Sequence, residues 1–171
     1  KYRRLDPLLM GCQEMAARMC KSEPYSHELA AWTGQLYRRS QADRFSENEL
    51  DRLRQAGCLI SDLAWASHPS FRALMVGQTV LTAPFSGISH SGRIFLTRAL
   101  IHRHELRGDE PDFGTLNLSA NDERLARVLG LSQRLAHSLS ASLPGVLPQT
   151  RLKAGRNKLK LYISPQLSDL S

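Results

Sequence analysis

Long apolar runs, phosphate-binding loops and aromatic residues are missing or scarce in this 171-residue chain. No apolar run approaches the roughly 20 residues that a helix needs to cross a bilayer. Gly-x-x-x-x-Gly-Lys, Gly-x-Ser-x-Gly and His-Glu-x-x-His are all absent, which excludes the usual P-loop, serine-hydrolase and zinc-peptidase sites. Aromatic residues make up 6% of the chain against 42% for all hydrophobic residues, so we expect a soluble protein whose core consists of packed aliphatic helices.

Cysteine is also sparse. Cys12, Cys20 and Cys58 form an odd set without Cys-x-x-Cys spacing, which argues against a disulfide framework or a zinc knuckle. The set is typical of a reducing compartment, and we therefore expect a cytoplasmic protein that does not contact membranes.

An initiator methionine is also missing. The chain begins Lys-Tyr-Arg-Arg. We interpret the chain as a piece of a longer protein.

Positive charge, by contrast, is abundant. The formal net charge is +7 and the pI is about 9.8, a balance that favours nucleic acid, polyphosphate or an acidic protein surface as the partner. The basic residues gather at about 93–107 and 151–160, without the interleaved aromatics that would stack on bases. That pattern favours a phosphate polymer without bases. The candidate phosphate contacts are Arg93, Arg98, Arg103, Lys153, Arg156 and Lys158.

Helix-start signals recur along the first 143 residues. Asp6-Pro7 predicts a helix over about 6–21, and Ser26 is expected to cap a second one. The capping box at Ser46 begins a third helix, whose apolar stripe continues to Ala64. Further helices are predicted over 69–82, over about 90–107, and after Ser119. In the helix over 69–82, the side chains expected to point inward are Phe71, Leu74, Met75 and Leu81.

The periodicity changes after Pro144-Gly145. Residues 158–163 alternate between polar and apolar, which is typical of a half-buried strand with Leu159, Leu161 and Ile163 on one face. Residues 146–152 are the expected partner strand, with the turn at 154–157. The sequence therefore predicts a mainly α fold with a small C-terminal β-hairpin. We divide it into a helical domain, 1–143, and a hairpin appendage packed on it, 144–171.

The step Ser61-Asp62 resembles the adjacent His-Asp metal-ligand pair of HD-type phosphohydrolases, with serine in place of the histidine. His27, Asp62 and His68 are the candidates for a vestigial site of this kind. His102 and His104 are two residues apart, so on a helix only one of them can face a shared site. The histidines are open to two interpretations, as metal ligands or as hydrogen-bonding residues of the core and its rim. Serine is a poor metal ligand, and we expect neither bound metal nor catalysis in this chain.

A series of segments in order resembles the C-terminal, HD-related helical region of bacterial Ppx/GppA proteins, the exopolyphosphatase and guanosine pentaphosphate phosphatase family. The resemblance covers about residues 5–107 best, and the last helix and hairpin agree in layout. Its segments are 26–33 (Ser-His-Glu-Leu-Ala-Ala-Trp-Thr), 56–65 (Ala-Gly-Cys-Leu-Ile-Ser-Asp-Leu-Ala-Trp), 67–69 (Ser-His-Pro), 84–93 (Pro-Phe-Ser-Gly-Ile-Ser-His-Ser-Gly-Arg) and 99–104 (Ala-Leu-Ile-His-Arg-His).

The resemblance implies an HD-domain-like helical bundle from an exopolyphosphatase-type enzyme. In that family an N-terminal actin-like region cleaves the phosphoanhydride with Mg²⁺, while the C-terminal region binds polyphosphate and contributes to a homodimer. We therefore expect this chain to bind polyphosphate and the catalytic region, without being catalytic alone and without a cofactor of its own. Two alternatives are a self-sufficient metal-dependent HD phosphohydrolase and a nucleic-acid-binding helical module.

Overall fold

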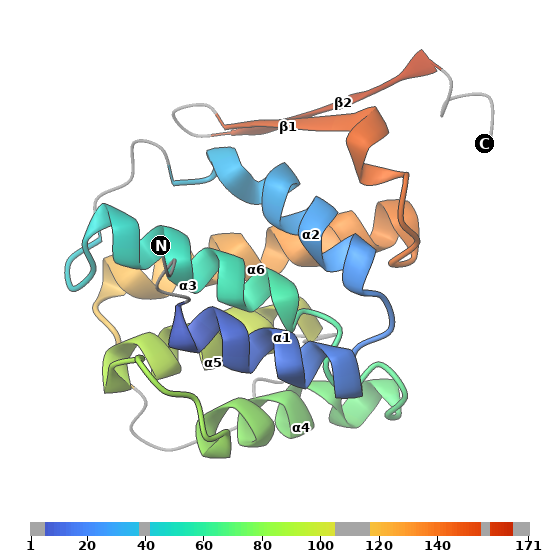
Figure 1. The fold of residues 1–171 in the computed structure, drawn as a ribbon. Coiled ribbons are helices and arrows are strands. Elements are labelled where there is room, and N and C mark those ends of the chain that lie inside the picture. Colours follow the sequence, from blue (N-terminus) through green and yellow to red (C-terminus); the bar gives the residue numbers. More distant parts are fainter. Residues whose placement is uncertain (1–5, 38–41, 105–116, 155–157, 166–171) are drawn as a thin grey trace, which may run out of the picture.

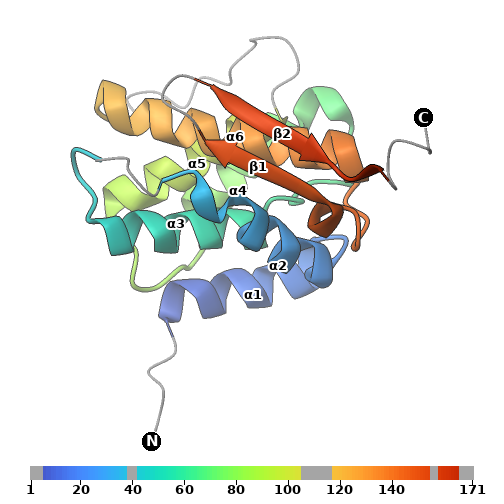
Figure 2. The ribbon, with the colours of Figure 1, turned by 90° about the horizontal axis from the view of Figure 1, so that it is seen from above.

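Six α-helices and one β-hairpin form the part of the chain that the structure, a computed structural model, describes: residues 6–37, 42–104, 117–154 and 158–165. The helices pack around one core, and the hairpin lies on one side of them, next to α2 (Figures 1 and 2). No helix within these residues is long and apolar enough to span a membrane. The elements are α1 (Pro7–Met19), α2 (Glu23–Trp32), η1 (Thr33–Gln35), α3 (Glu47–Leu59), α4 (Pro69–Thr82), α5 (His90–His104), α6 (Ala120–Ser140), η2 (Leu147–Gln149), β1 (Thr150–Ala154) and β2 (Leu159–Ile163).

Side-chain caps begin the helices, mostly where the sequence predicts them. Asp6 accepts hydrogen bonds from the first backbone N–H groups of α1, and Ser46 and Ser119 do the same for α3 and α6. The prediction for α2 was wrong, because Ser22 is its cap. Ser26 lies inside the helix and donates its hydroxyl to a backbone carbonyl. Pro24 near the helix start explains the difference, since proline is favoured in the first turn.

Helix α3 also ends earlier than predicted. It stops at Leu59 and gives way to a series of turns through residue 66. Ala64 has φ of 59°, a left-handed conformation that an α-helix cannot contain. The apolar stripe continues past the helix end because Ile60 and Leu63 are buried within the turns. These turns place Ser61 and Asp62 inside the protein.

Helix α5 is the centre of the fold, with α4 on one side and α6 on another (Figure 1). Eleven of the 15 residues of α5 are buried. The crossing with α6 is closest at Gly130, where an added Cβ would lie 2.2 Å from the carbonyl oxygen of Ala99. Only glycine allows such a close approach of two backbones. This packing buries the C-terminal end of α5, which carries Arg103 and His104.

The face of α4 that packs inward is not the predicted one. Phe71, Leu74 and Met75 are exposed, by 59%, 37% and 46%, and Leu81 is half-buried. A second stripe at helical spacing, made of smaller residues, is buried instead. Small side chains let α4 approach α5 closely, which explains why this stripe is preferred. The buried residues of α4 are Ala73, Val76, Gly77 and Val80.

The hairpin is antiparallel, as predicted, and pairs Leu152 with Leu161. Its first strand starts later than predicted, because η2 occupies residues 147–149. The predicted buried face is buried only in part: Leu152 belongs to the core and Leu161 packs against it, whereas Leu159 and Ile163 are exposed. Through Leu152 the hairpin shares the hydrophobic core of the helices.

Candidate functional site

A buried ion pair occupies the position of the HD-like step. Asp62 lies in the turns after α3, and its Oδ1 accepts a hydrogen bond from Nη2 of Arg103 on α5 at 3.3 Å. Both side chains are buried. Burial lowers the pKa of Arg103, and the nearby Asp62 carboxylate opposes this shift. A guanidinium thus supplies the counter-charge that a metal ion would supply in an HD site.

Other polar groups surround this pair. His104 Nε2 lies 3.0 Å from the carbonyl oxygen of Ser61, which makes His104 the donor and places a proton on its Nε2. Burial and the neighbouring Arg103 lower the pKa of His104 to about 3. Within the described residues, the Tyr25 hydroxyl, Asp62 Oδ2 and Arg103 Nε have no hydrogen-bond partner. Burial raises the pKa of Tyr25 to about 12.

The structure does not bring the candidate metal ligands together. His27 is exposed on α2, with Nε2 3.8 Å from Oε1 of Glu23. His68 is exposed and caps α4, accepting a hydrogen bond from the backbone N–H of Ser70 at 3.3 Å. Asp62 is held by Arg103. Across the part of the chain that is described, no three His, Cys, Asp or Glu side chains are placed to hold a metal ion.

The two histidines near the end of α5 contact different elements. His102 Nε2 lies 3.0 Å from Oε1 of Glu123 on α6, whereas His104 bonds to the turn after α3. This divergence follows from their spacing of two residues on a helix. Both histidines are buried, and both make hydrogen bonds that stabilise the packing of α5.

The arginines of α5 are also bonded within the fold. Arg93 donates to the carbonyl oxygens of Val80 at 2.9 Å, Ala83 at 2.6 Å and Phe85 at 3.2 Å, and so covers the C-terminal end of α4. Arg98 Nε donates to Oε2 of Glu123 at 2.9 Å. Together with Arg103, these are three of the six predicted phosphate contacts. The structure places all three in internal hydrogen bonds, so we do not include them in a binding surface.

The basic residues of the hairpin have different surroundings. The register pairs Arg151 with Tyr162 and Lys153 with Lys160, which places these side chains on the face opposite Leu152. Arg151, Lys153, Lys158 and Lys160 are exposed, and within the described residues none has a carboxylate within 4 Å. Arg156 lies outside the described residues. We call these four residues the outer basic face.

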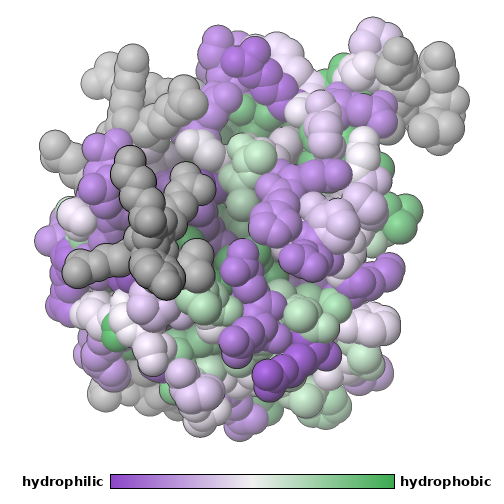
Figure 3. Space-filling model, in the orientation of Figure 1, coloured by the Kyte–Doolittle hydropathy of each residue, from purple (hydrophilic) through white to green (hydrophobic). Residues whose placement is uncertain are grey.

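Hydrophilic colours predominate over the hairpin end of the molecule, at the top of Figure 3. Of the hairpin residues that the structure describes, the sequence analysis named Lys153 and Lys158 as phosphate contacts. Arg151 and Lys160 are exposed as well. The alternation of Leu152 and Leu161 with basic residues could have identified them, because side chains alternate between the faces of a strand.

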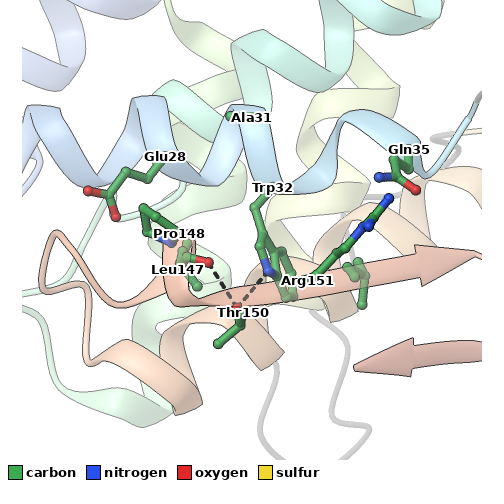
Figure 4. A pocket seen from close by; sticks show the side chains of 9 residues that line it. Glu28, Ala31, Trp32, Gln35, Leu147, Pro148, Thr150 and Arg151 are labelled. Carbon is green, nitrogen blue, oxygen red and sulfur yellow. Dashed lines mark hydrogen bonds between the residues drawn. The ribbon is translucent and has the colours of Figure 1, made fainter. Parts of the chain in front are cut away.

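An open pocket of about 180 Å³ lies between α2 and β1 (Figure 4). Trp32 Nε1 donates to the Thr150 hydroxyl at 2.9 Å on its floor, and Thr150 donates to the Leu147 carbonyl. Arg151 extends along one side towards Gln35 (Figure 4), so the pocket adjoins the outer basic face. Its lining residues are Glu28, Ala31, Trp32, Gln35, Leu147, Pro148, Thr150, Arg151 and Leu152.

Comparison with known proteins gives one family match. A family model described as "Exopolyphosphatase, C-terminal" matches residues 8–171. The comparison with curated proteins found no match. Apart from Pro7, the matched range includes the six helices, the buried ion pair and the hairpin.

Proposed function

Because the chain belongs to the exopolyphosphatase C-terminal family, we propose that it binds inorganic polyphosphate on the outer basic face of its hairpin. The observation that carries this proposal is the set of exposed cations, Arg151, Lys153, Lys158 and Lys160, which have no carboxylate partner within the described residues. An arginine fork and lysine ammonium groups are the side chains that bind phosphate oxygens best. The formal net charge of +7 adds long-range attraction for a polyanion.

The cross-strand pair Lys153 and Lys160 supports an anion as the ligand. Like charges directly opposite each other on two antiparallel strands destabilise the pair. A phosphate lying between the two ammonium groups would remove this repulsion. Along each strand, side chains on one face are spaced by about 7 Å, so a flexible chain of phosphates can contact several of them at once.

The ligand that we propose has no bases. Tyr162 is the one aromatic side chain on the outer side of the hairpin within its described residues. Sequence-independent binding of single-stranded nucleic acid uses several aromatic side chains on which successive bases stack. A nucleic-acid-binding module is therefore the second candidate, favoured only by Tyr162.

We assign hydrolysis of the phosphoanhydride, and the Mg²⁺ that it requires, to an N-terminal catalytic region, as the family resemblance implies. The Asp62–Arg103 pair supports this division. A divalent ion at Asp62 would have to displace a buried guanidinium and leave it without its counter-charge, which costs several kcal/mol. The second contribution that we propose for this chain is a contact between subunits.

The binding proposal is tested by removing charge from the outer basic face. The variant Lys153→Gln/Lys158→Gln/Lys160→Gln should bind long-chain polyphosphate about tenfold more weakly or worse, because it loses three exposed ionic contacts. The matched control, Arg18→Gln/Lys21→Gln/Arg127→Gln, removes the same charge at other exposed positions and should change the affinity by less than about threefold. Equal losses in both variants would contradict the proposal.

A competition experiment separates the two candidate ligands. Polyphosphate labelled at one end is bound to the chain, and unlabelled polyphosphate or single-stranded RNA is added at equal phosphate concentration and equal salt. We expect polyphosphate to be the better competitor. If RNA competes better, the ligand is a nucleic acid, and the loss of affinity on Tyr162→Ala should then reach about 1–3 kcal/mol.

A further inference from the structure

Three buried polar atoms at the Asp62–Arg103 pair have no hydrogen-bond partner within the described residues. They are the Tyr25 hydroxyl, Asp62 Oδ2 and Arg103 Nε. The three residues are 1%, 5% and 6% exposed, so bulk solvent does not reach these atoms. Leaving a buried polar group without a partner lowers stability. Folded proteins therefore satisfy nearly all such groups, either with another protein group or with an ordered water.

The three atoms lie together in space. Arg103 Nη2 donates to Asp62 Oδ1 at 3.3 Å. Nε and Nη2 share one edge of the planar guanidinium, so the Nε–H group points to the same side as this bond. Tyr25 lies close enough to the pair for the charges of both partners to shift its pKa. The group is thus formed by α2, the turns after α3 and α5, which are distant in the sequence.

The ion pair does not close as a fork. A bidentate arginine–carboxylate pair makes two parallel hydrogen bonds, with N···O distances of about 2.7–2.9 Å. Here there is one bond at 3.3 Å, and the second donor and the second acceptor both remain over. The side chains that neighbour the group are small, which leaves more room beside it than larger residues would. They are Cys20, Ser140 and Ser142.

We propose that one ordered water molecule binds inside the protein at this point and bridges Arg103 Nε, Asp62 Oδ2 and the Tyr25 hydroxyl. The water accepts a hydrogen bond from Nε–H, donates one to Oδ2 and shares a third with the hydroxyl. About three hydrogen bonds is the usual number for a buried water. The water would connect α2, the turns after α3 and α5 at a single point.

The charges at the site favour water over an ion. A cation bridging these atoms would lie against the Arg103 guanidinium, and an anion would lie against the Asp62 carboxylate. The two charges of the pair balance each other, so neither kind of ion gains a net attraction. The unpartnered atoms are one donor, one acceptor and one hydroxyl that can act as either. Water is neutral and both donates and accepts, so it fits this set.

The protein hydroxyls nearest to Tyr25 are already bonded elsewhere. Ser140 and Ser142 are close enough to lower the pKa of Tyr25. The Ser140 hydroxyl donates to the carbonyl oxygen of Ala136 at 2.8 Å. The Ser142 hydroxyl is paired with Nδ1 of His137 at 2.9 Å. Both serines thus have partners of their own, which leaves the proposed water as the partner of the Tyr25 hydroxyl.

A crystal structure of the 171-residue chain, at a resolution that shows ordered waters, tests the proposal directly. We expect an isolated peak of electron density within about 3.2 Å of all three atoms. Crystals soaked in MnCl₂ should show no anomalous peak there. A direct bond from Arg103 Nε to Asp62 Oδ2 that closes the fork without a water would overturn the inference. A manganese peak at this position would also overturn it.

The sign of a stability change provides a second test. If the Tyr25 hydroxyl is bonded to a water, Tyr25→Phe should lower the folding equilibrium constant about tenfold, because a buried hydrogen bond is lost. If the hydroxyl has no partner, the same change should be neutral or stabilising. Tyr37→Phe is the matched control, since the buried Tyr37 hydroxyl donates to the carbonyl oxygen of Leu125 at 2.7 Å. It should lose stability by a similar factor.

Urea denaturation of the three proteins measures both changes. A Tyr25→Phe protein at least as stable as the natural chain, beside a destabilised Tyr37→Phe protein, would overturn the inference. A loss in Tyr25→Phe without the density peak would assign the hydroxyl to Ser140 or Ser142, and would overturn it too. No polyphosphate is present in either experiment, so both results are independent of the binding titration.

Discussion

The arginines of α5 and the basic residues of the hairpin are similar side chains in opposite surroundings. Arg93 is bonded to carbonyl oxygens at the end of α4, and Arg103 is bonded to Asp62 in the core. Lys153 and Lys160 face each other on an exposed surface without a carboxylate nearby in the described residues. Each of these side chains adds one positive charge, yet only those of the hairpin have no acceptor of the protein bound to them within the described residues.

This difference shows which property separates a structural cation from a binding one. A structural cation has hydrogen-bond acceptors of the protein around it, and its removal leaves buried acceptors unsatisfied. A binding cation is surrounded by water, and its removal costs the fold little. Substitutions in α5 should therefore change stability without changing polyphosphate affinity, and substitutions in the hairpin should do the reverse.

The largest effect is expected at the buried ion pair. Asp62→Asn and Arg103→Met should each lower the free energy of unfolding by about 3–5 kcal/mol, because each leaves a buried charge without its partner. Urea denaturation measures the loss. The double variant Asp62→Leu/Arg103→Met should lose less than either single one, since no unpaired charge remains. A double variant that loses the sum of both single effects would show that the two side chains do not act as a pair.

The next largest effect is expected at Arg93. Arg93→Met should lower the free energy of unfolding by about 2–3 kcal/mol, because the carbonyl oxygens of Val80 and Ala83 lose a charged donor. Arg93→Lys should recover part of this loss, because an ammonium group reaches fewer acceptors than a guanidinium. Polyphosphate affinity should stay within about twofold in both variants. A folded Arg93→Met protein with natural stability and weaker binding would move Arg93 to the binding surface.

A smaller effect is expected from pH. The pKa of His104 in the folded protein is about 3, below the unfolded value of roughly 6.5. At a pH between these two values the unfolded chain binds a proton at His104 and the folded chain does not. The contribution of His104 to the free energy of unfolding is therefore fully present above about pH 6.5 and is lost as the pH falls. The loss from pH 7.5 to 5 should be roughly 2 kcal/mol from this residue. In His104→Gln, which keeps a donor for Ser61, this part of the pH dependence should disappear.

Local signals predicted much of the fold. The caps at Asp6, Ser46 and Ser119 depend only on neighbouring residues, and all three are confirmed. The β-hairpin follows from the alternation in its second strand. The cap at Ser26 was wrong because Ser22 competes for the same role nearby, and the sequence alone gives no energy difference between the two.

Long-range packing explains the rest. The sequence of α4 contains two apolar stripes, and the buried one is chosen by the close packing of α5, which local periodicity does not encode. The arginines of α5 resemble a basic stripe until Glu123 and Asp62, from other elements, are placed beside them. The sequence also suggested His27 and Asp62 as members of one metal site, because their distance in space is not encoded locally. In the structure His27 is exposed beside Glu23, whereas Asp62 is buried with Arg103.

The most direct test compares the salt dependence of polyphosphate affinity in Lys160→Gln and Arg98→Gln. Each variant removes one positive charge, the first from the outer basic face and the second from an ion pair with Glu123. The slope of log affinity against log salt concentration is negative, and its magnitude should decrease by roughly 0.7 in Lys160→Gln, because one phosphate contact is lost. It should stay unchanged in Arg98→Gln. A slope of smaller magnitude in Arg98→Gln, with an unchanged slope in Lys160→Gln, would contradict binding at the hairpin.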